Sequence, residues 1–127
     1  MTADIKATIE QEFLSNWSTT PIQFEGVKFD YTGKDSWVSL VYTPVVSDRY
    51  GFNGTAIGRV RYVGIQKVFC YAKNPTKAYK LADAVKTFLN GKEINGLVFD
   101  IGQDRAVLDL NNGYFETVVN TEVVNFS

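Results

Sequence analysis

The chain has 127 residues, of which 45% are hydrophobic and 21% charged, and its formal net charge is −1. This balance is typical of a single globular domain over residues 1–127 and excludes a disordered chain. The single cysteine, Cys70, excludes an intrachain disulfide, and the absence of histidine removes the commonest general base and metal ligand. No apolar run approaches a membrane span, and residues 1–12 contain acids that a signal peptide would lack.

Charge is distributed unevenly along the chain. Residues 58–92 contain eight Lys or Arg residues and one acid, Asp83. Residues 1–57 have four bases and seven acids, and residues 93–127 have one base and six acids. A chain with a basic middle and acidic ends can attract its own copies or another anionic partner, so the pattern favours assembly or binding.

The first predicted element is an amphipathic helix. Ile5, Ile9, Phe13 and Trp17 recur every four residues, with Leu14 beside them, and polar side chains occupy the other side. The helix is expected to end within residues 16–18, because the Thr-Thr-Pro sequence of residues 19–21 disfavours its continuation.

Strands are predicted next. Residues 21–24 form a short extended piece, and residues 37–46 form a longer strand that is apolar on both faces. Such a strand is usually covered by two layers, so we expect both of its faces to be buried. Pro44 indicates that the far end of this strand lies at a sheet edge or a bulge.

Residues 47–57 are predicted to be a loop, because Gly51 and Gly54 interrupt them and Asn-Gly is a strong turn signal. The loop displays Arg49, Tyr50 and Phe52, residue types that are enriched in binding hot spots. We therefore predict that these three residues contact a subunit or a partner. The alternative is that the two aromatic side chains fold back and cover an apolar end of the sheet.

The most regular part of the chain follows the loop. Residues 59–73 are predicted to form a strand of unusual length, since strands average five or six residues. Its polar ends, Arg59, Arg61 and Lys73, are expected to overhang the sheet and to join the predicted subunit interface.

A second amphipathic helix is predicted over residues 75–90. Asn74 is a suitable cap, and Pro75 occupies the first helical position, where its missing N–H costs nothing. A single apolar stripe predicts its buried face, and Asn90-Gly91 marks its end. The stripe consists of Ala78, Leu81, Ala82, Val85, Phe88 and Leu89.

The rest of the chain is predicted to be strands. These cover residues 97–101, 105–110 and 114–126, with a hairpin turn at residues 111–113. The order helix, strands, helix, strands predicts an α+β fold: a single domain with a mostly antiparallel β-sheet and two amphipathic helices packed on it.

No arrangement of residues suited to catalysis is visible, so we predict that the protein is not an enzyme and needs no metal or cofactor. Cys70 lies mid-strand without a histidine partner, which favours a small core residue over a nucleophile. Asp100 and Asp104 flank Gly102, but two carboxylates in a turn are a weak metal signal.

A nucleic-acid-binding module is the alternative prediction. In residues 58–92, Arg59, Arg61, Lys67 and Lys73 alternate with aromatic residues, as they would in a platform on which bases stack. The same aromatic residues are needed to fill a small core, however, and the chain is acidic overall. We therefore favour a core and subunit interface for this segment.

The layout resembles that of the tail terminator, or tail completion, proteins of lambda-like long-tailed bacteriophages. The resemblance lies in pattern and order over about residues 5–91, and residues 92–127 add little to it. The matching parts are the first helix through Phe13-Leu14, TPIQFEGVKF at residues 20–29, the strand of residues 37–42, a long polar loop, RYVGIQKVF at residues 61–69 and AYKLADAV at residues 78–85.

The resemblance implies a structural protein of the virion tail that is assembled in the host cytoplasm. Such terminators form a ring, usually a hexamer, that caps the tail tube, stops its polymerisation and presents a surface for head–tail joining. The implied partners are other copies of the chain, the tail tube protein and the head-side connector, with no role for a membrane. A closed ring needs two different surfaces on each subunit, which agrees with the uneven charge.

Overall fold

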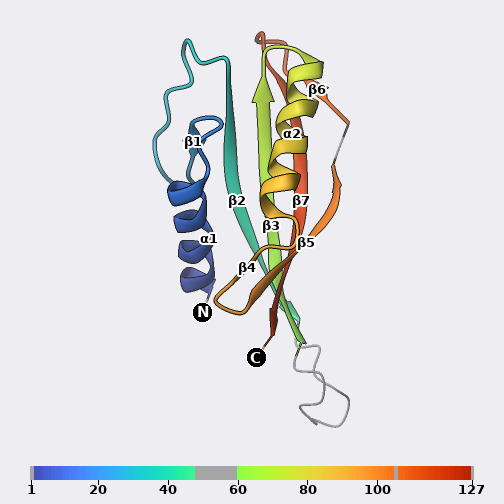
Figure 1. Ribbon diagram of the computed structural model, residues 1–127. Coiled ribbons are helices and arrows are strands. Elements are labelled where there is room, and N and C mark those ends of the chain that lie inside the picture. The colour runs from blue at the N-terminus through green and yellow to red at the C-terminus, as the bar shows by residue number, and fades with distance from the viewer. Residues whose placement is uncertain (1, 48–59, 105, 127) are drawn as a thin grey trace.

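The protein packs its helices against one face of a twisted sheet (Figure 1). The computed structural model describes residues 2–47, 60–104 and 106–126, and the side chains of residues 2, 3, 45–47, 60–63, 103, 104, 125 and 126 are outside that description. Within these ranges the elements are α1 (Thr2–Asn16), β1 (Ile22–Gln23), β2 (Ser36–Ser47), β3 (Val60–Ala72), α2 (Pro75–Leu89), β4 (Glu93–Ile94), β5 (Leu97–Asp104), β6 (Leu108–Asp109) and β7 (Phe115–Phe126).

The described strands form one seven-stranded sheet in the order β1-β2-β3-β7-β5-β4, with β6 also paired to β7. β1 runs parallel to β2, and every other pair is antiparallel. The central strand β3 pairs along most of its length with both β2 and β7, so that Val68 lies opposite Leu40 on one side and Val119 on the other. The predicted α+β fold with a mostly antiparallel sheet is therefore confirmed.

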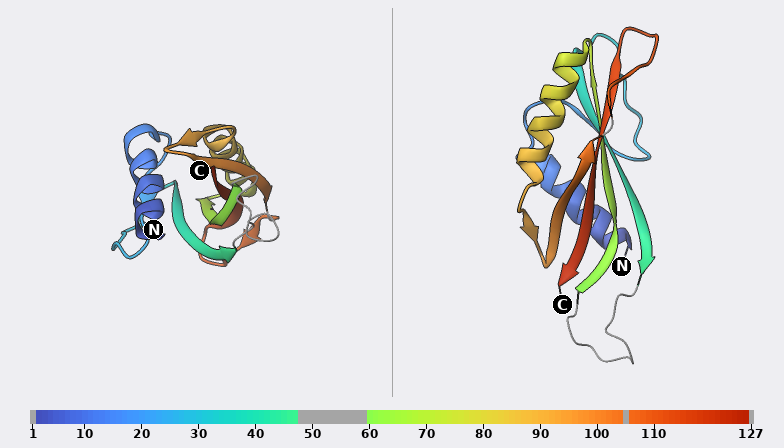
Figure 2. Two further views of the ribbon diagram at one scale, coloured as in Figure 1. Left: turned by 90° about the horizontal axis from the view of Figure 1, so that it is seen from below. Right: turned by 90° about the vertical axis from the view of Figure 1, so that its right-hand side faces the viewer.

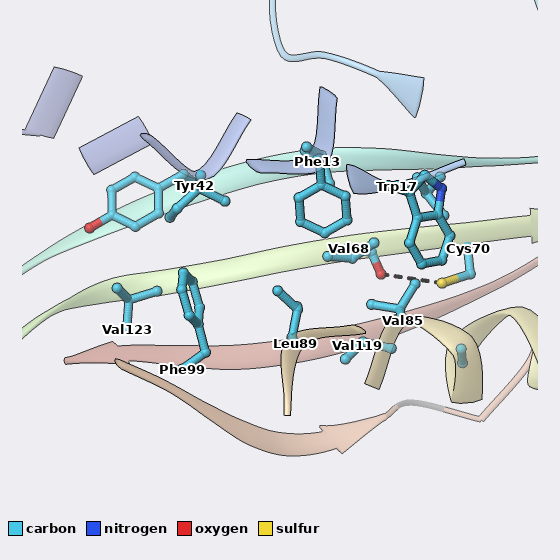
Figure 3. Close-up of a cluster of buried hydrophobic side chains, with 14 of the residues drawn as sticks. Phe13, Trp17, Tyr42, Val68, Cys70, Val85, Leu89, Phe99, Val119 and Val123 are labelled. Atoms are coloured by element: carbon cyan, nitrogen blue, oxygen red, sulfur yellow. Dashed lines mark hydrogen bonds between the residues drawn. The ribbon is translucent and has the colours of Figure 1, made fainter. Parts of the chain in front are cut away.

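The core lies between the sheet and the two helices (Figure 3). Strands alternate their side chains between two faces, and most buried residues of β2, β3 and β7 fall on the helix side, whereas Trp37 and Val118 are buried on the other face. The predicted residues Ile5, Ile9 and Phe13 of α1 are all buried, as is Trp17 directly after the helix. Cys70 is fully buried on β3 among these side chains, and its Sγ lies 3.7 Å from the carbonyl oxygen of Val68. The prediction of a small core residue is thus confirmed.

The second helix begins where the sequence predicts. The Oδ1 atom of Asn74 accepts a hydrogen bond of 2.8 Å from the backbone N–H of Lys77, and Pro75 follows as the first helical residue. The helix ends at Leu89, and Gly91 has a φ of 70°, which a residue with a side chain would adopt only with strain. Leu81 and Val85 are buried as predicted.

Two irregularities curl the sheet. The register between β2 and β3 shifts between Pro44 and Ser47, and that between β3 and β7 shifts between Tyr62 and Gly64. Bulges bend a strand and increase its twist, which agrees with the strongly twisted sheet in Figure 2. The shift at Pro44 confirms the predicted bulge, and the short β1 pairs with β2 only at residues 38 and 39.

Aromatic side chains cover the start of β2 on the face away from the helices. Trp37 is 5% exposed and stacks on Tyr71 at 4.7 Å and on Tyr31 at 5.2 Å, measured between ring centroids. The ring of Tyr114 meets Trp37 edge-on at 4.8 Å, and its hydroxyl donates to the carbonyl oxygen of Lys34 at 2.8 Å. These contacts hold part of the connection between β1 and β2 against the sheet.

Several predictions about individual segments were wrong. β2 is not covered on both faces along its length, because the aromatic cover reaches only its start and Val41 stays half-buried. Phe88 is half-buried, although it packs on Phe13 at 4.8 Å, and Leu14 is 63% exposed. The strand predicted at residues 105–110 is reduced to the two exposed residues of β6, and the short β4 was not predicted.

The described part of the chain has no helix of the length and apolar character needed to cross a lipid bilayer.

Candidate functional site

The predicted interface residues fall mostly beyond what the structure describes. Arg49, Tyr50, Phe52 and Arg59 lie outside the described residues, and Arg61 is placed only by its backbone, opposite Asn125 on β7. Lys73 is described: it directly follows β3, is exposed, and its Nζ lies 3.6 Å from Oδ1 of Asp35. An ion pair this exposed contributes little to stability and leaves Lys73 accessible to a partner.

A groove of about 340 Å³ lies on the helix side of the molecule. Three segments that are distant in sequence form it: the connection after α1, the start of β2 and the first turns of α2. Leu81 and Ala84 give it an apolar wall, and hydroxyl and charged groups form the rest. Its lining residues are Thr19, Thr20, Asp35, Ser36, Lys77, Lys80, Leu81 and Ala84.

The groove carries unbalanced positive charge. Lys77 and Lys80 are exposed, and neither has an ion pair within the described ranges. The one acid in the lining, Asp35, is already close to Lys73. The hydroxyl of Thr20 is occupied, because it accepts from Nε1 of Trp17 at 3.1 Å and donates to a backbone carbonyl at 3.0 Å. Two cations are therefore free to meet an anionic group.

Two carboxylates face each other on the opposite side of the sheet. Asp100 on β5 lies directly opposite Glu122 on β7, and both residues are exposed. Their sequence neighbours Phe99 and Val123 are buried in the core, so the carboxylates point away from the helices. Neither acid has an ion pair in the parts of the chain that the structure covers. Like charges directly opposite each other destabilise a sheet, so this pair is a local cost.

A third charged contact is structural. Nζ of Lys92 lies 2.8 Å from Oε2 of Glu12 and 4.0 Å from the ring centroid of Phe88. The hydrogen bond from Lys92 lowers the pKa of Glu12 from its usual value. Because these residues join α1 to the turn after α2, the pair fixes the two helices relative to each other.

Among residues 2–47, 60–104 and 106–126, no group of three or more acids or cysteines is placed to hold a metal ion. Sequence reasoning missed both the groove and the opposed carboxylates. It noted the basic segment as a whole, but the groove depends on how the connection after α1 packs beside α2. The acid pair depends on the register of β5 with β7, which alternation alone does not define.

Comparison with known proteins identifies the fold and no family. No family model matches the sequence, and no curated protein matches it. One solved structure, of a protein known by a sequence identifier rather than a functional name, superposes with a TM-score of 0.65. It is 15% identical, and the match covers 100% of this chain and 96% of that one. The likeness therefore extends over the whole α+β fold.

Proposed function

We propose that the protein is a tail terminator subunit of a long-tailed bacteriophage. In this role its copies close into a ring, which in the family that the chain resembles is usually a hexamer, and the ring caps the tail tube, stops its polymerisation and offers a surface for joining the head. The role is structural rather than catalytic, and the partners are other copies, the tube protein and the head-side connector.

One observation carries the proposal: the sheet buries only one of its faces along its whole length. Below the aromatic cover of Trp37, the second face has no further layer among the described residues (Figure 2). Antiparallel sheets can face water on one side, and that side is then normally polar. Here it retains a band of half-buried apolar side chains, namely Val41, Ile65, Phe69, Val98 and Val124.

A face of this kind suits a subunit that is covered by neighbours. Its apolar residues alternate with Lys67, Asn120 and Glu122, which gives the mixed character of an interface that assembles from soluble subunits. A partly exposed apolar band on an isolated protein is typical of a surface for interaction.

The direct test is the length of tail tubes. Light scattering and negative-stain imaging of the purified protein should first detect rings. Added to polymerising tube protein from the same phage, the wild-type chain should give tubes of limited length. Tubes that grow equally long with and without the protein would refute the proposal.

A variant of the predicted loop sharpens this test. If Tyr50 and Phe52 contact the tube or connector, replacing both by Ser should leave thermal stability almost intact and release the control of length. A large drop in melting temperature would instead assign the two aromatic side chains to the core.

Nucleic-acid binding is the second candidate, because one observation favours it. Lys67, Phe69 and Tyr71 alternate along β3 on the face away from the helices, and Lys73 follows the end of the strand. Against it, the ring of Tyr71 is already stacked on Trp37 at 4.7 Å. Binding to single-stranded DNA that weakens steeply with salt would favour this candidate over the terminator role.

A further inference from the structure

We propose that the groove beside α2 receives the opposed carboxylates of a second copy of this chain. Lys77 and Lys80 of one subunit would then pair with Asp100 and Glu122 of its neighbour. The proposal rests on the ring of the proposed function and deepens it, because it assigns the contact by which successive subunits join.

The spacing of the two charge pairs matches. Lys77 and Lys80 are three residues apart on a helix, so their Cβ atoms are about 5–6 Å apart. Asp100 and Glu122 are directly opposite on neighbouring antiparallel strands, so their Cβ atoms are about 4.5–5.5 Å apart. Each cation can therefore meet one carboxylate without either pair having to spread.

Neither pair has an ion pair with any side chain that the structure describes. Lys77 and Lys80 line a groove whose single acid, Asp35, lies 3.6 Å from Lys73. Asp100 and Glu122 repel each other on an exposed face, and a neighbour's cations would remove this repulsion. The two lysines and the two carboxylates therefore complement each other as charges that have no described ion pair of their own.

The apolar parts of the two surfaces add to the fit. Leu81 and Ala84 line the same groove as the two lysines. Around the acid pair, the half-buried Ile65 lies opposite Glu122 on β3, and Val98 lies two residues before Asp100 on the same face. Contact would therefore bury apolar side chains together with the charged ones, and specific interfaces combine both kinds of contact.

The placement of the two surfaces favours a ring over a dimer. The groove is on the helix side of the sheet, whereas the carboxylates point from the opposite face. A contact between two different surfaces of identical chains is head-to-tail, and it closes into a ring when the rotation between neighbours allows it.

Two charge-reversed proteins test this contact. One carries Lys77→Glu and Lys80→Glu, and the other carries Asp100→Lys and Glu122→Lys. Lys28→Glu and Asp109→Lys are the matched controls, since both residues are exposed and lie outside the two surfaces. Masses are measured by light scattering at low and at high salt, and circular dichroism verifies that each variant is folded.

Each reversed protein alone should remain monomeric, because its two contact surfaces then carry the same sign of charge. Mixed in equal amounts, the two should recover the wild-type mass, with the variants alternating around the ring. High salt should weaken the wild-type assembly, and the controls should behave like wild type. Either reversed protein assembling normally by itself, or a folded mixture that stays monomeric, would overturn the contact.

The outcome is separable from that of the proposed function. Tubes of limited length together with unaffected assembly of the reversed proteins would refute this contact and leave the terminator role standing. If the mixture recovers the wild-type mass but the wild-type ring has no effect on tube length, the contact is supported and the terminator role is refuted. A wild-type chain that is monomeric at every concentration would overturn the contact directly. If the mixture of the two reversed proteins assembles only when inorganic phosphate is added, the groove binds a free anion, and the contact is likewise overturned.

Discussion

Two neighbouring residues of α1 offer a sharp test of how this helix packs. Phe13 is 0% exposed and its ring lies 4.8 Å from that of Phe88 and 5.9 Å from that of Trp17, whereas Leu14 is 63% exposed. Both side chains are large and apolar, and they belong to the same turn of the same helix. Truncating each to alanine therefore compares burial with exposure at nearly constant helix propensity.

Phe13→Ala removes a whole ring from the contact between both helices and the sheet. Losses for such truncations are about 3–5 kcal/mol, which for a domain of this size lowers the melting temperature by about 10–20 °C. Leu14→Ala should change the free energy of unfolding by no more than about 0.5 kcal/mol, since surface substitutions rarely do more.

The assay is urea unfolding followed by circular dichroism, at two protein concentrations because assembly adds to apparent stability. A total stability of about 5–15 kcal/mol leaves room for Phe13→Ala to fold, and Phe13→Leu provides a milder variant if it does not. Equal losses for the variants of Phe13 and Leu14 would refute the packing described for α1. A loss at Leu14 that appears only at high protein concentration would show that assembly covers this side of the helix.

Three further predictions concern local features. Lys92 lowers the pKa of Glu12 in the folded state, so the stability from this pair is complete above the ordinary pKa of glutamate, about 4.3, and is lost as the pH falls through the lowered pKa. Glu12→Gln should therefore flatten that part of a plot of melting temperature against pH. A plot that does not change would contradict the pairing. Gly64→Ala should destabilise the protein, because a Cβ there would come within 2.6 Å of the backbone oxygen of Thr43, and a melting temperature equal to wild type would disprove that close approach. Asn74→Ala should cost about 0.5–2 kcal/mol of unfolding free energy in urea titrations by removing the cap of α2, while Asn74→Ser, which keeps a capping oxygen, should restore most of it.

The sequence predicted most reliably what depends on neighbouring residues. The cap and first residue of α2, its buried stripe and the α1 residues that face the core all follow from local spacing. Leu14 was harder to place, because it lies at the margin of its stripe, where a small rotation of the helix decides between burial and exposure. The two-residue strands β4 and β6 carry too few side chains to show any alternation.

The candidate site was harder to predict from the sequence, because it depends on contacts between distant segments. Lys73 was predicted at an interface from its place at a strand end, but its proximity to Asp35 depends on how β2 pairs with β3. The opposition of Asp100 and Glu122 likewise depends on a pairing between residues that are 22 positions apart. A single sequence shows which charges exist, whereas the register of the strands determines which of them meet.

Because Cys70 is buried, its reaction with a thiol reagent reports transient opening of the core. It is the chain's only cysteine, and it lies fully buried at the centre of the sheet beneath the helices. A thiol reagent can reach its sulfur only when the helices lift away or the domain unfolds, so the labelling rate measures how often that happens. Labelling at low and at high protein concentration would therefore show, without any engineered probe, whether self-association slows the opening of the core.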